Sequence, residues 1–194
     1  MAFENSDLVE VVSNISLAML NFSFLSEPEK ITEDLFCDEQ TKMNHRCIPG
    51  TVICQCIHRL KVKLHSVVDL IVKLHSVVGL IVIDIHVGRT HPFHMHGHKF
   101  YVLEMGNLNA TVTAEQIKKH GPRYTKTVLV PNQGYVRVRF RADNAGFWLA
   151  HCHFDWHLEV GMAFIMQVGE MDKKPKVPEN FPKCSNCVPE KLKI

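Results

Sequence analysis

Apolar residues alternate with polar ones in several short runs of the chain, which is the spacing of a strand with one buried face. The clearest run is 135–141, where Val136, Val138 and Phe140 alternate with arginines. Further strands are predicted over residues 8–12, 80–87, 99–105, 127–130, 147–150 and 162–168, with a short helical turn within 113–120. Many short strands separated by turn residues favour an antiparallel β-sandwich.

One ten-residue segment occurs twice in tandem. Residues 63–72 read Lys-Leu-His-Ser-Val-Val-Asp-Leu-Ile-Val, and residues 73–82 repeat them with Gly79 in place of Asp69. Ten residues lengthen a strand by roughly 33 Å, which is too long for an ordinary sheet, whereas an even number preserves the alternation of faces. We therefore expect one copy to loop out, for example as an added hairpin; an error in the gene model is the alternative. As copies of one residue, His65 and His75 are not expected to bind metal.

Length and composition indicate one well-filled globular domain. The chain has 194 residues, of which 46% are hydrophobic, and a formal net charge of +2. This charge gives no reason to propose nucleic acid or a membrane as a partner. We expect lead-in strands and a cysteine-bearing loop over residues 1–57, a core over 58–169 and a coil tail over 170–194.

Cysteine usage and glycosylation motifs favour an oxidising compartment. Cys54 and Cys56 are too close in sequence to bond each other without strain, so each is expected to pair elsewhere. Apart from Cys152 there are six cysteines, and three Asn-x-Ser/Thr sequons begin at Asn14, Asn21 and Asn109. The N-terminus shows no signal peptide. We therefore expect a piece of a longer, secreted protein; a cytosolic protein whose sequons occur by chance is the alternative.

Histidine clusters in two windows, 91–98 and 151–157, which hold seven of the thirteen histidines. If the second window is extended, His151 and His153 point to one side and Cys152 to the other, so one strand can serve two metal sites. Cys152, His157 and Met162 offer a thiolate, an imidazole and a weak thioether, the soft ligands of a blue-copper centre that lacks one more histidine. The first window is where that histidine should lie. Zinc is the alternative metal, although the methionine argues against it.

Together, the sequences His91-Pro-Phe-His94-Met-His96-Gly-His98 and His151-Cys-His-Phe-Asp-Trp-His157-Leu-Glu-Val-Gly-Met162 resemble the C-terminal copper-binding region of multicopper oxidases, specifically the laccase branch. The flanking residues 99–103, 142–148 and 158–162 and the early cysteine loop look most like arthropod laccases. The resemblance runs from about residue 8 to the end, apart from the duplicated segment. It implies an all-β, cupredoxin-like Greek-key β-sandwich with short helical loop insertions.

The resemblance also implies two sets of copper ligands. The type 1 copper would be held by His91, Cys152 and His157, with Met162 axial. The ligands of the cluster that reduces oxygen would be His94 for the type 2 copper and His96, His151 and His153 for the type 3 pair.

The same resemblance suggests roles for neighbouring residues. His157 would lie at the solvent-facing edge where electrons enter, and Asp155 would be a proton relay, with a plain surface carboxylate as the alternative. His98 would support a copper ligand by hydrogen bonding. Trp156 and Phe147 are expected to belong to the core.

The implied activity is that of a secreted p-diphenol:O2 oxidoreductase. Electrons from a phenolic or diphenolic reductant would pass through Cys152 to a trinuclear copper site that reduces O2 to water. That site needs eight histidines, half of them from a first domain, and this chain carries four. We therefore expect a fragment lacking the first two domains and inactive alone toward oxygen, in which Cys184 resembles a cysteine that relatives bridge to the first domain. A stand-alone blue-copper electron carrier and a non-functional truncated fragment are the alternatives, and ferroxidase chemistry is a less favoured parent activity.

Overall fold

A computed structural model describes residues 15–20, 22–37, 46–47, 54–73, 90–107, 110–112, 115–116, 124–132 and 134–181. Several predictions lie outside these residues. They are the strands at 8–12 and 80–87, the three sequon asparagines, most of the second repeat copy and Cys184.

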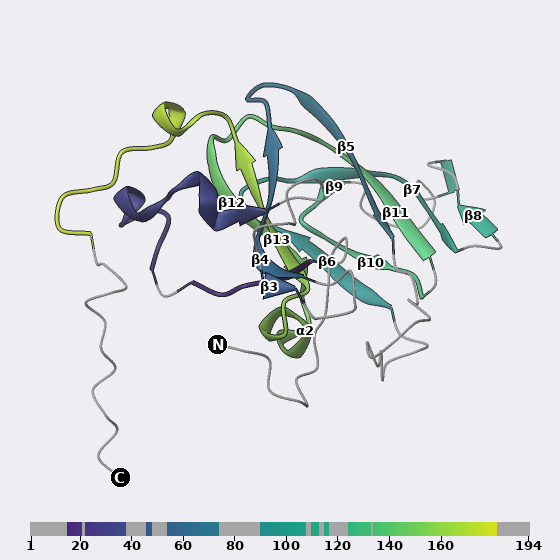
Figure 1. Ribbon diagram of the computed structural model, residues 1–194. Helices are drawn as coiled ribbons and strands as arrows, with labels where there is room; N and C mark the ends of the chain where they lie inside the picture. The colour runs from purple at the N-terminus through teal and green to yellow at the C-terminus, as the bar shows by residue number, and fades with distance from the viewer. Residues whose placement is uncertain are drawn as a thin grey trace, which may run out of the picture.

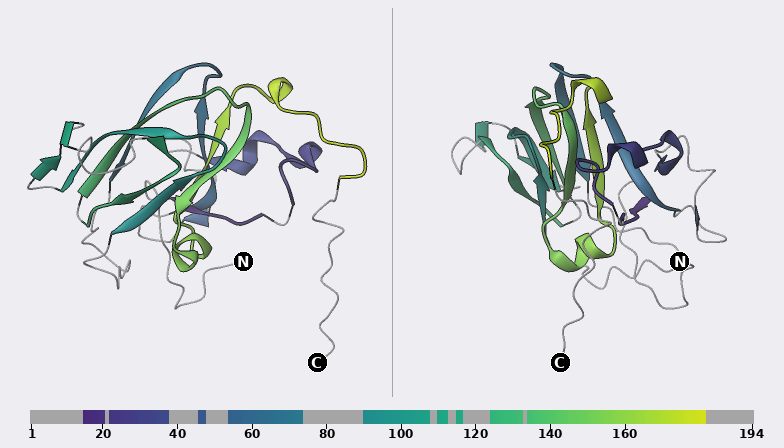
Figure 2. Two further views of the ribbon diagram at one scale, coloured as in Figure 1. Left: turned by 180° about the vertical axis from the view of Figure 1, so that it is seen from behind. Right: turned by 90° about the vertical axis from the view of Figure 1, so that its left-hand side faces the viewer.

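The described strands form two sheets. The first contains β1 (Ile15–Leu17), β2 (Phe36–Cys37), β3 (Arg46–Cys47), β4 (Cys54–Val62), β6 (His91–Met95), β10 (Thr127–Val130), β12 (Gly146–Cys152) and β13 (Ala163–Val168). The second contains β5 (Val67–Lys73), β7 (Phe100–Asn107), β8 (Ala110–Val112), β9 (Tyr124–Thr125) and β11 (Gly134–Arg141). The two sheets lie as layers in the right-hand view of Figure 2.

Short helical segments complete the described structure. Three 3-10 turns, η1 (Pro28–Lys30), η2 (Glu33–Leu35) and η4 (Met171–Lys173), lie in the lead-in and the tail, and α2 (Asp155–Glu159) lies beyond the ends of β12 and β13 (Figure 1). No described helix is long and apolar enough to cross a membrane.

Apolar side chains from both sheets meet between the layers. Val136, Val138 and Phe140 of β11 are each at most 2% exposed, as their alternation predicted. They pack in one cluster with Phe93 and Met95 of β6, and with residues of β4, β7, β12 and β13. The core of the sandwich therefore holds in place β6 and β12, the strands that carry parts of the two histidine windows.

Most predicted strands that fall within the described residues are present. Strand β10 has the predicted bounds, and β7, β11, β12 and β13 differ from prediction by at most two residues at either end. The pairing is mostly antiparallel, as favoured by the sequence, but β4 pairs in parallel with β1, β2 and β13. These partners are distant in sequence from β4, so alternation along one strand carries no information on their direction.

The first repeat copy supplies β5. In the antiparallel pairing with β11, Asp69 lies opposite Arg139 and accepts hydrogen bonds from Arg139 and Arg137. These bonds hold the pKa of Asp69 well below its usual range. The second copy has Gly79 at the equivalent position, so it lacks the carboxylate that pairs with β11.

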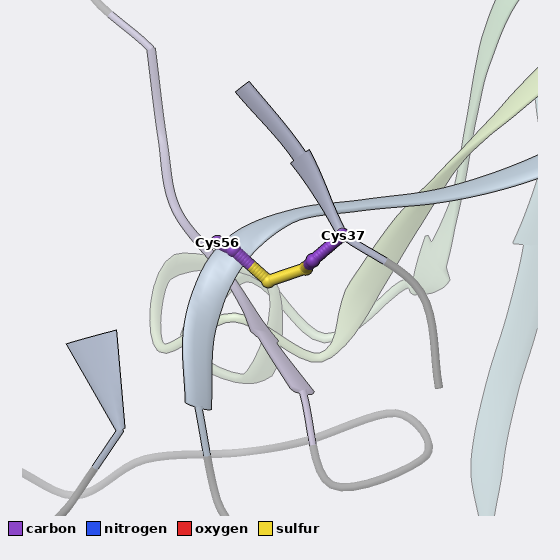
Figure 3. The surroundings of a disulfide bond; sticks show 2 residues. All are labelled: Cys37 and Cys56. Atoms are coloured by element: carbon purple, nitrogen blue, oxygen red, sulfur yellow. A yellow bond between two sulfur atoms is a disulfide. The ribbon is translucent and has the colours of Figure 1, made fainter. Parts of the chain in front are cut away.

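A disulfide ties the lead-in to the sandwich. Cys37 of β2 is bonded to Cys56 of β4, as Figure 3 shows, and Cys54 is also disulfide-bonded, which confirms that Cys54 and Cys56 do not pair with each other. The Cys37–Cys56 bond closes a loop with a sequence separation of 19. Such a loop stabilises a fold by about 3 kcal/mol in the chain-entropy account.

Apolar side chains of the lead-in gather on the face of the first sheet that points away from the sandwich core. Leu17, Phe24 and Phe36 form an apolar cluster with Phe147 of β12 and Ile165 of β13. Phe147 is therefore a packing residue, as predicted. The lead-in covers the part of β12 that precedes the second histidine window and leaves the window itself at the end of the strand.

Candidate metal centre

The two histidine windows lie side by side because β6 and β12 pair antiparallel. His94 lies opposite His151, and Phe93 lies opposite Cys152. Neighbouring residues on a strand face opposite sides of the sheet, so Cys152 and His151 reach different sides. The pairing thus builds two clusters of donor side chains back to back.

The first cluster is buried and consists of two histidines and one cysteine. These residues, His91, Cys152 and His157, are 6%, 5% and 3% exposed. The Nδ1 atoms of the two histidines lie 3.1 Å apart. The sulfur of Cys152 lies 3.6 Å from Nδ1 of His91 and 3.4 Å from Nδ1 of His157.

These distances allow a geometric test of metal binding. A triangle with these three sides has a centre about 2.0 Å from each corner, which matches the roughly 2.0 to 2.3 Å bonds that imidazole nitrogen and thiolate sulfur make to a metal such as zinc. A two-histidine, one-thiolate trigonal set is also the donor set of blue-copper sites. The residues present therefore fit a single transition-metal ion.

Helix α2 brings His157 back toward Cys152. The sequence pattern suggested an extended window, but the chain turns after His153 and Asp155–Glu159 form one helical turn. After the helix, the backbone N–H of Met162 donates to the carbonyl of His157, and the N–H of Cys152 donates to the carbonyl of Met162. The loop that carries Met162 is thus bonded to both of these cluster residues.

Strand β1 supports that loop. The N–H of Leu17 donates to the carbonyl of Gly161, and the hydroxyl of Ser16 donates to the carbonyl of Val160. Gly161 has a φ of +103°, and a Cβ there would lie 2.1 Å from the Ser16 hydroxyl. The close approach of β1 therefore requires glycine directly before Met162.

The second cluster contains the four histidines His94, His96, His151 and His153. The Nε2 atoms of His96 and His151 lie 3.1 Å apart. The ring of His94 lies 4.9 Å, 5.4 Å and 5.1 Å from those of His96, His151 and His153, centre to centre. His151 is buried whereas His96 and His153 are exposed, so this cluster opens at the surface.

Hydrogen bonds fix which ring nitrogens face the clusters. Nδ1 of His151 lies 2.8 Å from the carbonyl oxygen of Cys152, and because a carbonyl only accepts, Nδ1 carries the proton and Nε2 is left as the donor to a metal. Nδ1 of His94 lies 2.6 Å from the hydroxyl of Thr127, and because a hydroxyl can both donate and accept, this contact is compatible with either tautomer of His94. The buried cluster presents Nδ1 atoms, and the surface cluster presents Nε2 of His96 and His151.

Loss of hydration disfavours the charged form of three histidines in the surface cluster. The pKa values of His94, His96 and His151 are lowered, first by loss of hydration and then by repulsion from neighbouring histidines. The carboxylate of Asp155 acts on the pKa of His151 in the opposite direction. Neutral imidazole is the form that binds a metal, so these rings are prepared for ligation near pH 7.

The structure corrects one prediction about an individual residue. Trp156 is 50% exposed, so its assignment to the core was wrong; the short helix α2 turns this side chain away from the sandwich. His157 is 3% exposed, with the Phe154 ring packed edge-on against it, and its role at the edge where electrons enter stays a prediction. Asp155 is exposed, which is compatible with either of its predicted roles.

His98, the last residue of the first window, is buried. Its ring lies 5.5 Å from the ring of Phe140 and 5.9 Å from that of Trp148. Burial lowers the pKa of His98, and its contact with the backbone of His96 acts in the opposite direction. A supporting role for His98 next to His96 stays a prediction.

Gly97 forms the turn between His96 and His98. Its φ is +71°, and a Cβ would lie 2.2 Å from the Trp148 ring. The indole N–H of Trp148 donates to the carbonyl of Asn144, whose side-chain amide donates to the carbonyl of Gly97. The ring is thereby held over the turn and cannot move aside easily.

We therefore expect Gly97→Ala to destabilise the protein by about 3 kcal/mol, from the strained φ together with the overlap with Trp148. Gly169→Ala is the matched control, since Gly169 has a φ of +74° but its added Cβ would meet only Leu64, at 3.2 Å. It should cost about 1 kcal/mol. Urea unfolding measures both, and equal losses would show that Trp148 does not constrain this turn.

Two site residues had no signal in the sequence. Thr127 contacts His94 because β10 pairs with β6, and Phe154 contacts His91 and His157 because α2 folds back. Both contacts arise between segments whose pairing is set by the tertiary fold. Single-strand periodicity does not contain that information.

Comparison with known proteins finds relatives for the part of the chain that holds both clusters. A family model described as "Multicopper oxidase" matches residues 28–172, which include both clusters. Laccase-6 and Laccase-9 of Arabidopsis thaliana are 41% and 43% identical over 99 and 102 residues, and Laccase-24 of Oryza sativa subsp. japonica is 42% identical over 101 residues. These relatives are plant laccases, so they give no support to the narrower resemblance to arthropod laccases.

Each of these alignments covers 49% or 50% of this chain and 17% of the relative, so the chain spans a small part of the proteins it matches. Among solved structures, a multicopper oxidase from Campylobacter jejuni, described as a metallo-oxidase, aligns with a TM-score of 0.46 at 27% identity, covering 57% of this chain and 20% of that one. Fet3p, described as a multicopper oxidase that functions in iron import, aligns with a TM-score of 0.43 at 26% identity, covering 61% of this chain and 22% of that one.

Proposed function

Because the chain belongs to the multicopper oxidase family, we propose that it is the C-terminal copper-binding domain of a secreted, laccase-type oxidase. In this proposal His91, Cys152 and His157 hold the type 1 copper with Met162 as a weak axial ligand. His94 would serve the type 2 copper, and His96, His151 and His153 the type 3 pair. One observation carries the proposal. The Nδ1 atoms of His91 and His157 and the sulfur of Cys152 form a triangle whose centre lies at metal-bond distance from all three atoms.

A type 1 copper in the buried cluster would supply one-electron redox chemistry, because a thiolate and two imidazoles suit both oxidation states of copper. The chain's own residues provide the connection onward. Cys152 belongs to one cluster, and its covalent neighbours His151 and His153 belong to the other. The hydrogen bond from Nδ1 of His151 to the Cys152 carbonyl adds a second, non-covalent link between the clusters.

The reductant in this proposal is a phenol or diphenol and the final acceptor is O2. The four-histidine cluster opens at the surface, where further domains of a longer protein would complete it. The Cys37–Cys56 disulfide supports an extracellular location, since disulfides persist in oxidising compartments.

Two alternatives remain. A stand-alone blue-copper electron carrier is favoured by the presence of all three strong type 1 donors within one chain. A non-functional fragment would carry the same residues without being used. In-frame genomic sequence upstream that encodes His-x-His motifs would favour the truncated oxidase over the carrier.

Copper loading of the purified chain tests the proposed site. We expect one tightly bound copper per chain and an intense blue thiolate-to-copper absorption band, because the thiolate lies in a dry, preformed donor set. The control is the same chain loaded with zinc, which should be colourless. A copper-loaded chain without the band would contradict the proposal.

A further inference from the structure

One histidine of the surface cluster is in contact with a side chain from a neighbouring strand. Nδ1 of His94 lies 2.6 Å from the hydroxyl of Thr127, because the antiparallel pairing of β6 with β10 sets these two residues directly opposite each other (Figure 1). Strand β10 is the last in the strand order of the first sheet, and Thr127 is exposed there. This hydroxyl therefore contacts the metal-binding surface and does not belong to the core.

The backbone around Thr127 is fixed by its own hydrogen bonds. The chain leaves the second sheet at the end of β9 and enters the first at the start of β10, with Lys126 between them. The hydroxyl of Thr125 donates to the carbonyl of Thr127 at 2.9 Å and accepts from its N–H at 3.2 Å. The N–H of Met95 donates to the carbonyl of Lys126, 3.1 Å away. These bonds place the Thr127 hydroxyl beside His94.

The surroundings of His94 indicate the direction of its hydrogen bond to the hydroxyl. The distance alone is compatible with either tautomer, since a hydroxyl both donates and accepts. The backbone of Lys126 also bonds to His94 and acts to raise its pKa, as an accepting carbonyl does, so the ring carries a proton on the side of β10. Three further imidazoles, those of His96, His151 and His153, lie around the same ring at 4.9 Å, 5.4 Å and 5.1 Å, centre to centre.

We propose that Thr127 is a positioning residue for His94: its hydroxyl accepts the Nδ1 proton and so leaves Nε2 as the nitrogen that binds a metal ion. This inference rests on the proposed function and adds to it the residue that orients the proposed type 2 ligand. The ligand atoms of His94, His96 and His151 lie within 4.8 Å of one another, so these rings can hold a metal ion together. A histidine that binds metal through one nitrogen is oriented by an acceptor on the other, and Thr127 supplies that acceptor.

The first test determines the tautomer of His94 in the metal-free chain. The two ring nitrogens of a histidine differ in their NMR shifts according to which of them carries the proton. In the parent chain and in Thr127→Ser, Nδ1 of His94 should carry it, whereas Thr127→Val should populate the other tautomer. Thr32→Val is the matched control, because Thr32 is also an exposed threonine but makes no side-chain bond to the 3-10 turn that it precedes. It should leave the His94 signals unchanged.

The second test measures metal binding at the surface cluster. Zinc is titrated into the chain and followed through the ring signals of His94, which distinguish this cluster from the buried one. Thr127→Val should bind zinc there roughly 10-fold more weakly, near the lower end of the loss expected when an outer partner of a ligand is removed. Thr127→Ser should bind zinc like the parent chain. Valine suits an exposed strand position as well as threonine does, so unfolding in urea should change little.

Three results would overturn the role of Thr127. The first is a His94 ring protonated on Nε2 in the parent chain. The second is equal zinc affinity in Thr127→Val and Thr32→Val. The third is a loss of stability in Thr127→Val with unchanged ring signals, which would assign the threonine to structure alone. The blue band of the copper-loaded chain tests the proposed function separately, because its absence would reject the buried copper site and leave the result on His94 standing.

Discussion

Cys152→Ser is expected to abolish the intense blue absorption of the copper-loaded chain and to weaken copper binding more than any other single substitution. The band arises from charge transfer between a thiolate and copper, so a hydroxyl cannot produce it. Serine is also a poor ligand at neutral pH because it stays protonated. We expect affinity to fall by more than the roughly 100-fold that loss of an outer hydrogen-bond partner of a ligand can cost.

The size of this effect follows from the burial of the cluster. Cys152 is 5% exposed and its sulfur lies within 3.6 Å of both Nδ1 atoms, so water cannot readily take the place of the sulfur. Absorption spectra and copper titration measure the change. Three of the other cysteines, Cys37, Cys54 and Cys56, are disulfide-bonded and cannot substitute.

His58→Gln is the control for this prediction. His58 is also buried, at 8% exposed, but it lies on β4 against the ring of Phe164 and belongs to neither metal cluster. Its variant should keep the blue band. A band that survives in Cys152→Ser would mean that another thiol binds the copper and that the assignment of the site is incorrect.

Much of the metal centre could be predicted because its information is local. The spacing within His91–Met95 and within the second window places alternate side chains on opposite faces, and this alone separates Cys152 from His151. The inner face of β11 follows from the same periodicity. These features need no knowledge of which strands pair.

Features that depend on distant segments could not be predicted in this way. The parallel pairing of β4 with β13 joins residues about a hundred positions apart, as in Arg59 with Ile165. The single turn of α2 has no side-chain N-cap and is too short for helical periodicity to be visible. Without that turn, the sequence pattern places Trp156 in the core and gives no contact between Phe154 and His157.

The copper-loaded chain alone is expected to accept electrons from a diphenol without catalysing oxygen reduction. Diphenol should bleach the blue band, because the three strong donors of the proposed type 1 site lie together within this chain. Oxygen consumption should stay at the level of the metal-free chain. The surface cluster offers four imidazoles, and two of its members, His96 and His153, are exposed to water rather than faced by further ligands within the described residues.

Geometry gives the reason for this difference between the clusters. Four imidazole donors cannot supply each ion of a trinuclear site with the several nitrogen ligands that hold copper firmly. Metal bound there should exchange readily with chelators, whereas copper at the buried cluster should not. An oxygen electrode and chelator titration measure the two properties on one sample.

His96→Ala is the decisive variant for the oxygen prediction. If the parent chain consumes oxygen with a diphenol and His96→Ala stops it, the four-histidine cluster reduces oxygen without a partner, and the expected inactivity is wrong. If consumption occurs equally in both, it comes from slow air oxidation at the buried copper, which Cys152→Ser should remove. No consumption in either is the expected result, and it would support the proposal that the histidines beside Cys152 need further donors from outside this chain.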